Sequence, residues 1–436
     1  MATRSSLLSA QKGKVHVDKC LTLFPHMLLC LAFTLFAVPC AANTAELSID
    51  VHKIKPTELL TGPYSYFVPP YSFYYFQHMD KLDLQFDWIR SGGTVYPLQE
   101  PKHAFTVNYK YKGHQYTLDE YLKRSSALGF LVLKDNLIIH EHYFHGADET
   151  SRFLSNSVGK SITSTLIGVL IDEGKIASID DPIIKYVPEL RDSGFNRVTL
   201  KQALEMATAV NLSYNVYDSH ASAHRFNAAN LTGAPSFMDL LKSVKPKLNV
   251  EPGNVFDYEN ENPAALGFVI EKVTGTSYSE CLEQKIWSKI GAQSDAFLYR
   301  AKAQPDQSAF GCLSATLRDY GRFGLMMMNG GSLGGTRVVS SSWVKASTTP
   351  VKYKAPMSVK TKRDDSVNLG YGYLWWIPAN RDHAFEGMGI FGQILYVNPA
   401  KHIVVVQMSA WSKPDEDASW DESTKVIDAI VAKLSR

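Results

Sequence analysis

The fold of this chain is decided by the stretch Ser157-Val-Gly-Lys160-Ser-Ile-Thr-Ser164. Apolar residues then recur at helical spacing as far as Gly174, a residue type that commonly ends helices: Ile162, Leu166, Val169 and Leu170. Side chains three positions apart share one face of a helix. The sequence therefore predicts that Ser157 begins a helix and that Lys160 lies one turn further along, on the same face.

This position suits nucleophilic chemistry. The unpaired N–H groups and the positive dipole end of a helix favour negative charge, so they can support an alkoxide or an oxyanion. A desolvated Lys160 has a lowered pKa, and a neutral amine can take the proton of Ser157. The alternative is a serine that caps the helix, followed by a surface lysine. This segment alone favours neither interpretation.

The same spacing occurs twice more in the chain. Ser9 and Lys12 lie in a basic leader, and Ser342 and Lys345 lie in a Ser-rich stretch that we interpret as a solvated loop. The residues before Ser157 differ from both, because 129–140 has the pattern of two short strands around an Asp-Asn turn. A hairpin is therefore expected just upstream of Ser157.

A second element contains Tyr258 and Asn260, in a loop before an apolar helix that ends at Gly275. In extended backbone, side chains two residues apart face the same way, so a phenol and an amide can project into one cleft. The same pattern at Tyr396 and Asn398 precedes Pro399, and there we expect a packed aromatic residue before a turn.

A third element runs from Phe385 to Gln393 and holds three glycines before a predicted hairpin of strands at 394–397 and 402–408. Glycine at such positions allows another group to approach the backbone closely. A substrate carbonyl that accepts an N–H from this edge fits the pattern. A plain glycine-rich loop is the alternative.

Taken in order, these elements and the segments 153–190 and 311–324 resemble the serine penicillin-recognising superfamily. This group includes class C β-lactamases, D-alanyl-D-alanine carboxypeptidases and related esterases and amidases. The Gly-x-x-Gly-Gln form at 389–393 and the aromatic segment 371–376 look most like its 6-aminohexanoate-dimer hydrolase branch. The resemblance implies an α/β (α+β) fold: an antiparallel sheet flanked by N- and C-terminal helices, with an inserted, mostly helical lobe.

The resemblance also implies residue roles. Ser157 matches the acylated nucleophile, Lys160 its general base, and Tyr258 the phenol that transfers protons, with Asn260 as the amide of the same motif. The backbone N–H groups of Ser157 and Ile390 would form the oxyanion hole.

Substrate-side assignments follow the same resemblance. Tyr217, or alternatively Tyr214, would line the cleft, and the substrate would be a small-molecule amide or ester. The chain lacks the Lys or His, Thr or Ser, then Gly triplet that most β-lactamases of this group carry, since His383-Ala-Phe has no glycine. This argues against an efficient β-lactamase. A β-lactamase or D-alanyl-D-alanine carboxypeptidase activity stays an alternative, as does a non-catalytic cell-wall or ligand-binding module.

Residues 1–42 have the layout of a secretory signal peptide, with basic residues before an apolar core at 27–38 that is too short to span a membrane. Translation from Met27, or retention of the segment as an anchor, are alternatives. The expected location is periplasmic or secreted. The net charge of +2 becomes near neutral once this leader is removed, so neither nucleic acid nor a membrane surface is an expected partner. Cys281 and Cys312 remain, and we expect free thiols rather than a disulfide.

We divide the remainder into an N-terminal extension at 43–123 and a hydrolase domain at 124–436, with the helical lobe at about 157–287. The extension contains an aromatic, Pro-interrupted run at 64–76 that cannot be one regular helix. His140-Glu-His142 is interpreted as half-exposed strand rather than as metal ligands. No metal or cofactor is expected.

Overall fold

The computed structural model describes residues 69–100, 104–212, 221–354, 369–378 and 382–436. The leader, Ser9 and both candidate cleft residues Tyr214 and Tyr217 lie outside the described residues. Contacts divide the chain into units at 1–43 and 44–436, and all described residues belong to the second.

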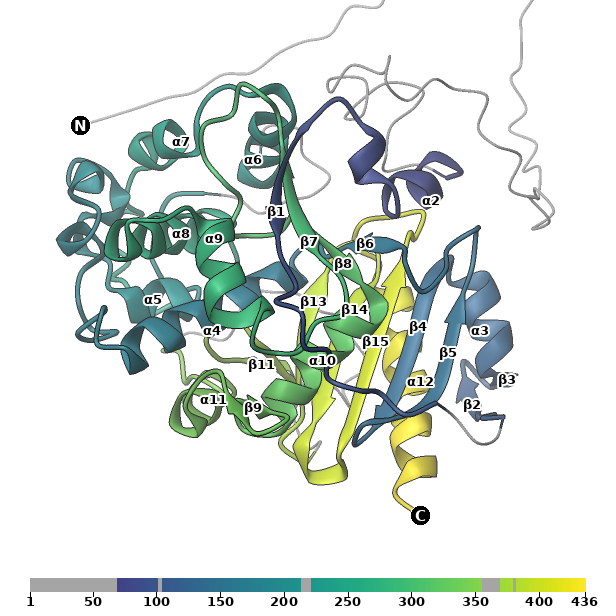
Figure 1. Cartoon of the computed structure of the whole chain (residues 1–436). Helices are drawn as coiled ribbons and strands as arrows, with labels where there is room; N and C mark the ends of the chain where they lie inside the picture. The colour runs from purple at the N-terminus through teal and green to yellow at the C-terminus, as the bar shows by residue number, and fades with distance from the viewer. Residues whose placement is uncertain (1–68, 101–103, 213–220, 355–368, 379–381) are drawn as a thin grey trace, which may run out of the picture. The chain divides into compact units, whose positions relative to one another are not determined.

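A seven-stranded antiparallel sheet forms the centre of this unit (Figure 1). In spatial order its strands are β11 (Leu369–Tyr371), β12 (Trp376–Pro378), β13 (Phe385–Gly389), β14 (Gln393–Asn398), β15 (Ile403–Ser409), β4 (Ala127–Lys134) and β5 (Leu137–Tyr143). Both predicted hairpins are confirmed, as β4–β5 and β14–β15. The last strand of the chain, β15, pairs with β4, so early and late segments form one sheet.

Side chains of these strands alternate between two hydrophobic cores. Leu131 and Val404 face α4 (Val158–Asp172) and α10 (Leu317–Met328), whereas Phe130 and Val405 face α3 (Leu118–Arg124) and α12 (Asp417–Leu434). Figure 1 shows α10 and α12 on opposite sides of the strands. This alternation follows from the two-residue period of a strand. The expected fold, an antiparallel sheet between helices, is confirmed.

The inserted lobe lies between α4 and β7 in the chain. Its helices are α5 (Leu200–Leu204), α6 (Ser222–Thr232), α7 (Phe237–Ser243), α8 (Glu261–Thr274) and α9 (Tyr278–Leu282). As predicted, α4 is followed closely by Gly174 and α8 by Gly275, and both glycines have positive φ. The lobe is therefore mostly helical, as expected.

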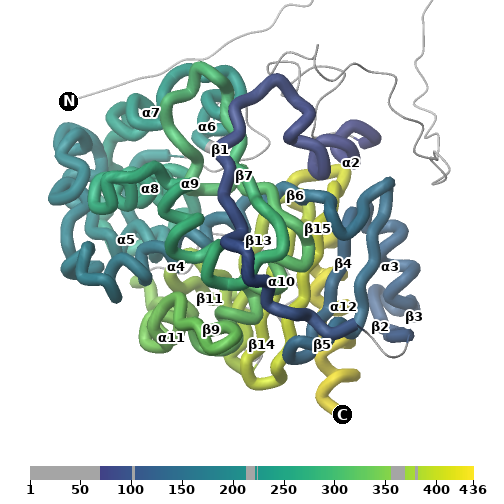
Figure 2. Tube along the Cα trace, in the orientation of Figure 1, coloured from purple at the N-terminus to yellow at the C-terminus, as the bar shows by residue number. Residues whose placement is uncertain are grey.

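A second sheet was not anticipated. Its order is β1 (Gln85–Ile89), β7 (Ala296–Arg300), β8 (Leu313–Thr316) and β6 (Arg152–Leu154), and all pairs are antiparallel. Figure 2 shows β1 running beside β7, although the two strands are far apart in sequence. Residues of the N-terminal extension thus complete a sheet whose strand β6 leads directly to Ser157.

Other described elements are short. They are α2 (Tyr71–Tyr75), β2 (Asn108–Tyr111), β3 (His114–Thr117), β9 (Ser332–Leu333), β10 (Thr336–Arg337), α11 (Ser341–Ser347), 3-10 turns at Met79–Lys81, Ile183–Lys185, Pro188–Leu190, Gly194–Arg197 and Pro399–Lys401, and a π turn at Glu283–Trp287. Within the described ranges, none of the helices is long and apolar enough to cross a membrane.

Two local predictions were wrong. Ser342 and Lys345 lie on α11 rather than in a loop, because Ser340 caps that helix and Trp343 anchors it in the core. The side chains of Ser342 and Lys345 are exposed. Gly387 and Gly389 lie inside β13 rather than ahead of a strand, because Phe385 to Gly389 pairs with β14. Cys281 and Cys312 are buried free thiols, as predicted.

Candidate active site

Ser157 occupies the N-cap position of α4, but its hydroxyl makes no capping bond to the helix backbone. The Oγ atom instead lies 2.8 Å from the Nζ atom of Lys160, one turn into the helix. Asn156, in left-handed backbone at φ 42°, donates its side-chain amide to the carbonyl of Ile390 at 2.9 Å. The interpretation of Ser157 as a simple helix cap beside a surface lysine is therefore wrong.

Lys160 is buried, with 1% of its surface exposed. Its Nζ atom also lies 2.8 Å from Oδ1 of Asn260 and 3.0 Å from the backbone carbonyl of Phe310. The three groups that bind Nζ are a hydroxyl, a carboxamide and a backbone carbonyl, and all are uncharged. Among the described residues, Lys160 makes no ion pair. Burial without a counter-ion lowers the pKa of Lys160 to about 7. A neutral amine in this place donates two hydrogens to Asn260 and Phe310 and offers its lone pair to the Ser157 hydroxyl.

Tyr258 lies next to both Ser157 and Lys160. Its ring stacks on Trp376 at 5.5 Å, and the Nζ atom of Lys160 lies 5.0 Å from the ring centroid. Burial raises the pKa of the Tyr258 phenol, against the opposing effect of its hydrogen bond with Ser157. Tyr258 therefore keeps its proton at neutral pH. The three residues that the sequence singled out, Ser157, Lys160 and Tyr258, do lie together, with Asn260 bound to Lys160.

The third element closes the site from the sheet side. A Cβ atom added to Gly389 would lie 2.9 Å from the backbone nitrogen of Ser157, so only glycine lets β13 come this close. The predicted close approach to the glycine-rich segment is thus confirmed. Within the described residues, the Ser157 N–H donates no backbone hydrogen bond, and its nitrogen lies close to Gly389 at the end of β13. Both Ser157 and Ile390 line a pocket at this position.

Three of the predicted site residues, Ser157, Asn260 and Ile390, line this pocket, together with several residues that the sequence did not predict; Lys160 and Tyr258 are not part of its lining. Its described lining comprises Asn156, Ser157, Asn227, Asn260, Tyr299, Phe310, Gly311, Cys312 and Ile390. The motif at 311–324 could have indicated Gly311 and Cys312. Asn227 on α6 and Tyr299 on β7 carry no signal in the sequence, because their position depends on how the lobe packs against the second sheet.

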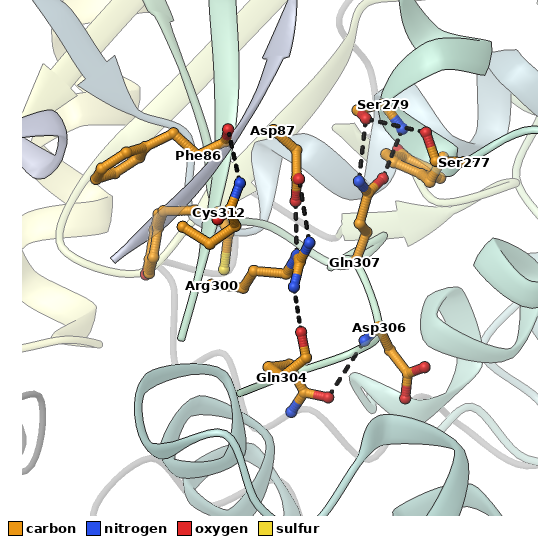
Figure 3. Close-up of polar contacts among 12 residues, drawn as sticks. Phe86, Asp87, Ser277, Ser279, Arg300, Gln304, Asp306, Gln307 and Cys312 are labelled. Atoms are coloured by element: carbon orange, nitrogen blue, oxygen red, sulfur yellow. Dashed lines mark hydrogen bonds and ion pairs between the residues drawn. The ribbon is translucent and has the colours of Figure 1, made fainter. Parts of the chain in front are cut away.

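The loop between β7 and β8 supplies Phe310, Gly311 and Cys312. Polar contacts hold it at its start and near its middle, as Figure 3 shows. Arg300 forms an ion pair with Asp87 of β1, at 2.7 Å from Nε to Oδ2, and donates to the carbonyl of Gln304. Further along, Gln307 exchanges two hydrogen bonds with Ser279 at 2.7 and 3.0 Å. The loop that supplies the carbonyl of Phe310 is thus attached to β1 and α9 through Arg300 and Gln307.

The fold and this arrangement of side chains define a β-lactamase and transpeptidase type of hydrolase. A family model described as "Beta-lactamase" matches residues 117–427. The chain belongs to this β-lactamase family of serine hydrolases.

Individual relatives agree with this assignment. The chain is 32% identical over 307 residues to a 6-aminohexanoate-dimer hydrolase of Paenarthrobacter ureafaciens, covering 68% of this chain and 76% of that protein. It is 22% identical to a putative D-alanyl-D-alanine carboxypeptidase of Escherichia coli, covering 67% and 81%. A solved structure described as "Putative 6-aminohexanoate-dimer hydrolase from Bacillus anthracis" matches with a TM-score of 0.71 at 25% identity, covering 85% of this chain and 96% of that one. The predicted resemblance is confirmed, and the relatives are hydrolases.

The support of the β7–β8 loop gives a first prediction. Replacing Asp87 with Asn removes the negative partner of a largely buried Arg300, and we expect a loss of about 1–3 kcal/mol of unfolding free energy, as for a buried donor that loses its acceptor. Hydrogen exchange should also become faster in residues 301–312. Chemical denaturation and exchange mass spectrometry measure the two effects.

The matched control is Lys302→Gln. Lys302 lies in the same loop and forms an ion pair with Asp83, which precedes β1. Both of those side chains are more than half exposed, so the change should be close to zero. Equal effects of the two substitutions would contradict the supporting role of Asp87.

Proposed function

We propose that this protein cleaves an amide or ester bond through an acyl-enzyme formed on Ser157. The observation that carries the proposal is the contact of 2.8 Å between Ser157 Oγ and a buried Lys160 Nζ whose other partners are all uncharged. A hydroxyl becomes a nucleophile when an adjacent base accepts its proton, and an amine with a pKa of about 7 is such a base at neutral pH.

Acylation then proceeds with three proton transfers. Neutral Lys160 takes the proton of Ser157 as Oγ bonds to the substrate carbonyl carbon. Tyr258, which keeps its proton because burial raises its pKa, donates to the leaving nitrogen or oxygen as the carbonyl bond to it breaks. The proton held by Lys160 then passes to the oxygen of Tyr258, which restores the phenol and the neutral amine. Water repeats these steps in reverse order and releases the acid, returning the proton to Ser157.

The oxyanion of the tetrahedral intermediate is assigned to the N–H groups of Ser157 and Ile390. The close approach of Gly389 to the Ser157 nitrogen supports this assignment, as does the location of both residues in the pocket wall. Donors held rigidly at this point act without reorganisation during the reaction.

The pocket also bears on the class of substrate. Among the described residues that line it, none is charged, and three are asparagines: Asn156, Asn227 and Asn260. A carboxylate next to the scissile bond, as in penicillins, would lose its hydration without gaining a cationic partner there. We therefore propose that the acyl donor is neutral and forms hydrogen bonds with the carboxamides of these asparagines. Hydrolysis of β-lactams is the second candidate activity.

Ser157→Ala should abolish both turnover of p-nitrophenyl butyrate and covalent labelling by a fluorophosphonate, while the protein stays folded. Intact-protein mass spectrometry after exposure to the fluorophosphonate, and separately to penicillin, measures the adduct. Ser342→Ala is the matched control, because Ser342 has the same spacing to Lys345 on an exposed helix. Retained labelling in Ser157→Ala would exclude the proposed nucleophile, and rapid penicillin turnover would reverse the substrate order.

The pH dependence follows from Lys160. Its pKa is lowered to about 7, and the neutral form is the active base. The kcat/KM value should therefore rise with pH through about 7 and fall on the acid side, where Lys160 is protonated. Initial rates with a neutral ester between pH 5 and 9 measure this acid limb of the kcat/KM profile, after subtraction of the rate that Ser157→Ala gives at each pH. A midpoint near the ordinary lysine value would contradict a desolvated Lys160.

We also propose that the protein is exported and that residues 1–42 are removed as a signal peptide. The supporting observation is the sequence pattern of a basic segment, an apolar core and small residues. Expression of the full chain in a bacterium, followed by fractionation and mass determination, should recover a shortened protein outside the cytoplasm. Recovery of the intact chain from the cytoplasm would contradict the proposal.

A further inference from the structure

Two acidic side chains are buried on either side of Asn260, the residue whose amide binds Lys160. Glu259 has 0% and Glu261 2% of its surface exposed. Acidic residues are almost never fully buried without a partner that compensates their charge. Their position between Tyr258 and the first turn of α8 links them directly to the catalytic segment.

The surroundings of Glu261 are only partly polar. Within the described residues, its Oε2 atom is buried and has no hydrogen-bond partner. Ser222 of α6 donates to Glu259 at 2.6 Å and also contacts Glu261. The charged groups that act on Glu261 are Arg225, on α6, and Lys160. A buried carboxyl with one unpartnered oxygen interacts strongly with any charge nearby, because little water screens it.

Glu259 and Glu261 are the main charged neighbours of Lys160, because the other ionisable groups near it are neutral at pH 7. Ser157 on its own helix and Tyr258 are neutral at pH 7, and burial raises the pKa of the Cys312 thiol, which keeps that group neutral too. Glu261 and Glu259 both favour the charged form of Lys160, against the larger effect of burial.

We propose that Glu261 is a positioning residue that acts on the reaction through Lys160: its negative charge sets the pH range over which Lys160 serves as the base. This inference rests on the proposed function. The acidic partner of the lysine then acts through space, from the residue that follows Asn260 in the chain, and not through a direct ion pair. The lysine can then lose its proton without breaking a salt bridge.

The coupling has a signature in the shape of the pH profile. Burial raises the pKa of Glu261 to about 7, so it ionises over the same range as Lys160. When the glutamate becomes negative it stabilises the ammonium form, which delays loss of the lysine proton. Two groups coupled in this way titrate over a wider pH span than either does alone.

The test is Glu261→Gln, which keeps the size and the hydrogen-bonding capacity of the side chain and removes its charge. The acid limb of kcat/KM for a neutral ester should move to lower pH by about one unit and narrow to the width of a single ionisation. Activity on the high-pH plateau should stay within a few-fold of the original, because Lys160 is neutral there in both proteins.

Glu271→Gln is the matched control. Glu271 lies on the same helix, and burial raises its pKa to about 7 as well, but it binds the backbone of Tyr278 and does not act on Lys160. Its substitution should leave the limb in place. An unchanged limb in Glu261→Gln, or an equal shift in Glu271→Gln, would overturn the inference.

Two further measurements separate the ways in which this test can fail. If Glu261→Gln does not fold, as judged by circular dichroism, Glu259→Gln should give a smaller shift in the same direction, and no shift would count against the inference. Labelling of Ser157 at pH 9 is measured in every variant. Normal labelling with an unchanged limb rejects the role of Glu261 alone, whereas retained turnover in Ser157→Ala rejects the proposed function itself.

Discussion

The burial of Lys160 is the constraint on which the rest of the site depends. An ammonium group removed from water is costly unless every hydrogen finds an acceptor, and here Ser157, Asn260 and Phe310 provide the three acceptors. None of them is charged, so either protonation state of the amine finds suitable partners, with only the direction of the Ser157 hydrogen bond reversed. A salt bridge in the same place would have held the charged form.

This constraint explains why the site is built from segments so far apart in the chain. The lysine and serine come from the first turn of α4, the amide from the start of α8, and the carbonyl of Phe310 from the loop before β8. Each segment lies at or near the beginning of a helix or strand. At such positions, some side chains and backbone groups have no hydrogen-bond partner within the helix or strand and can bind another group. Neither Ser157 nor Asn260 spends its side chain on capping its helix.

The sequence predicted the parts that depend on local pattern. Glycines at 174 and 275 mark where α4 and α8 end, and short apolar runs around turns indicate β4, β14 and β15. The spacing of Ser157 and Lys160 places both on one helix face, and the family resemblance adds Tyr258 to them. The pairing of β1 with β7 could not be predicted, because Gln85–Ile89 carries no mark of its distant partner. The helix at Ser341–Ser347 was missed for the opposite reason: its serines suggested a loop, while the packing of Trp343 decides the outcome.

The most important element that the sequence did not reveal is a backbone group. The carbonyl of Phe310 binds Lys160, and a carbonyl is present at every residue, so no residue type can mark which one will be used. Its place depends on Arg300 at one end of the loop, and Arg300 depends on Asp87 of β1. The loop that provides this carbonyl is therefore attached to a strand about 70 residues before Lys160 in the chain. In this way the segment 85–89, outside the three motifs, supports a loop that lines the site.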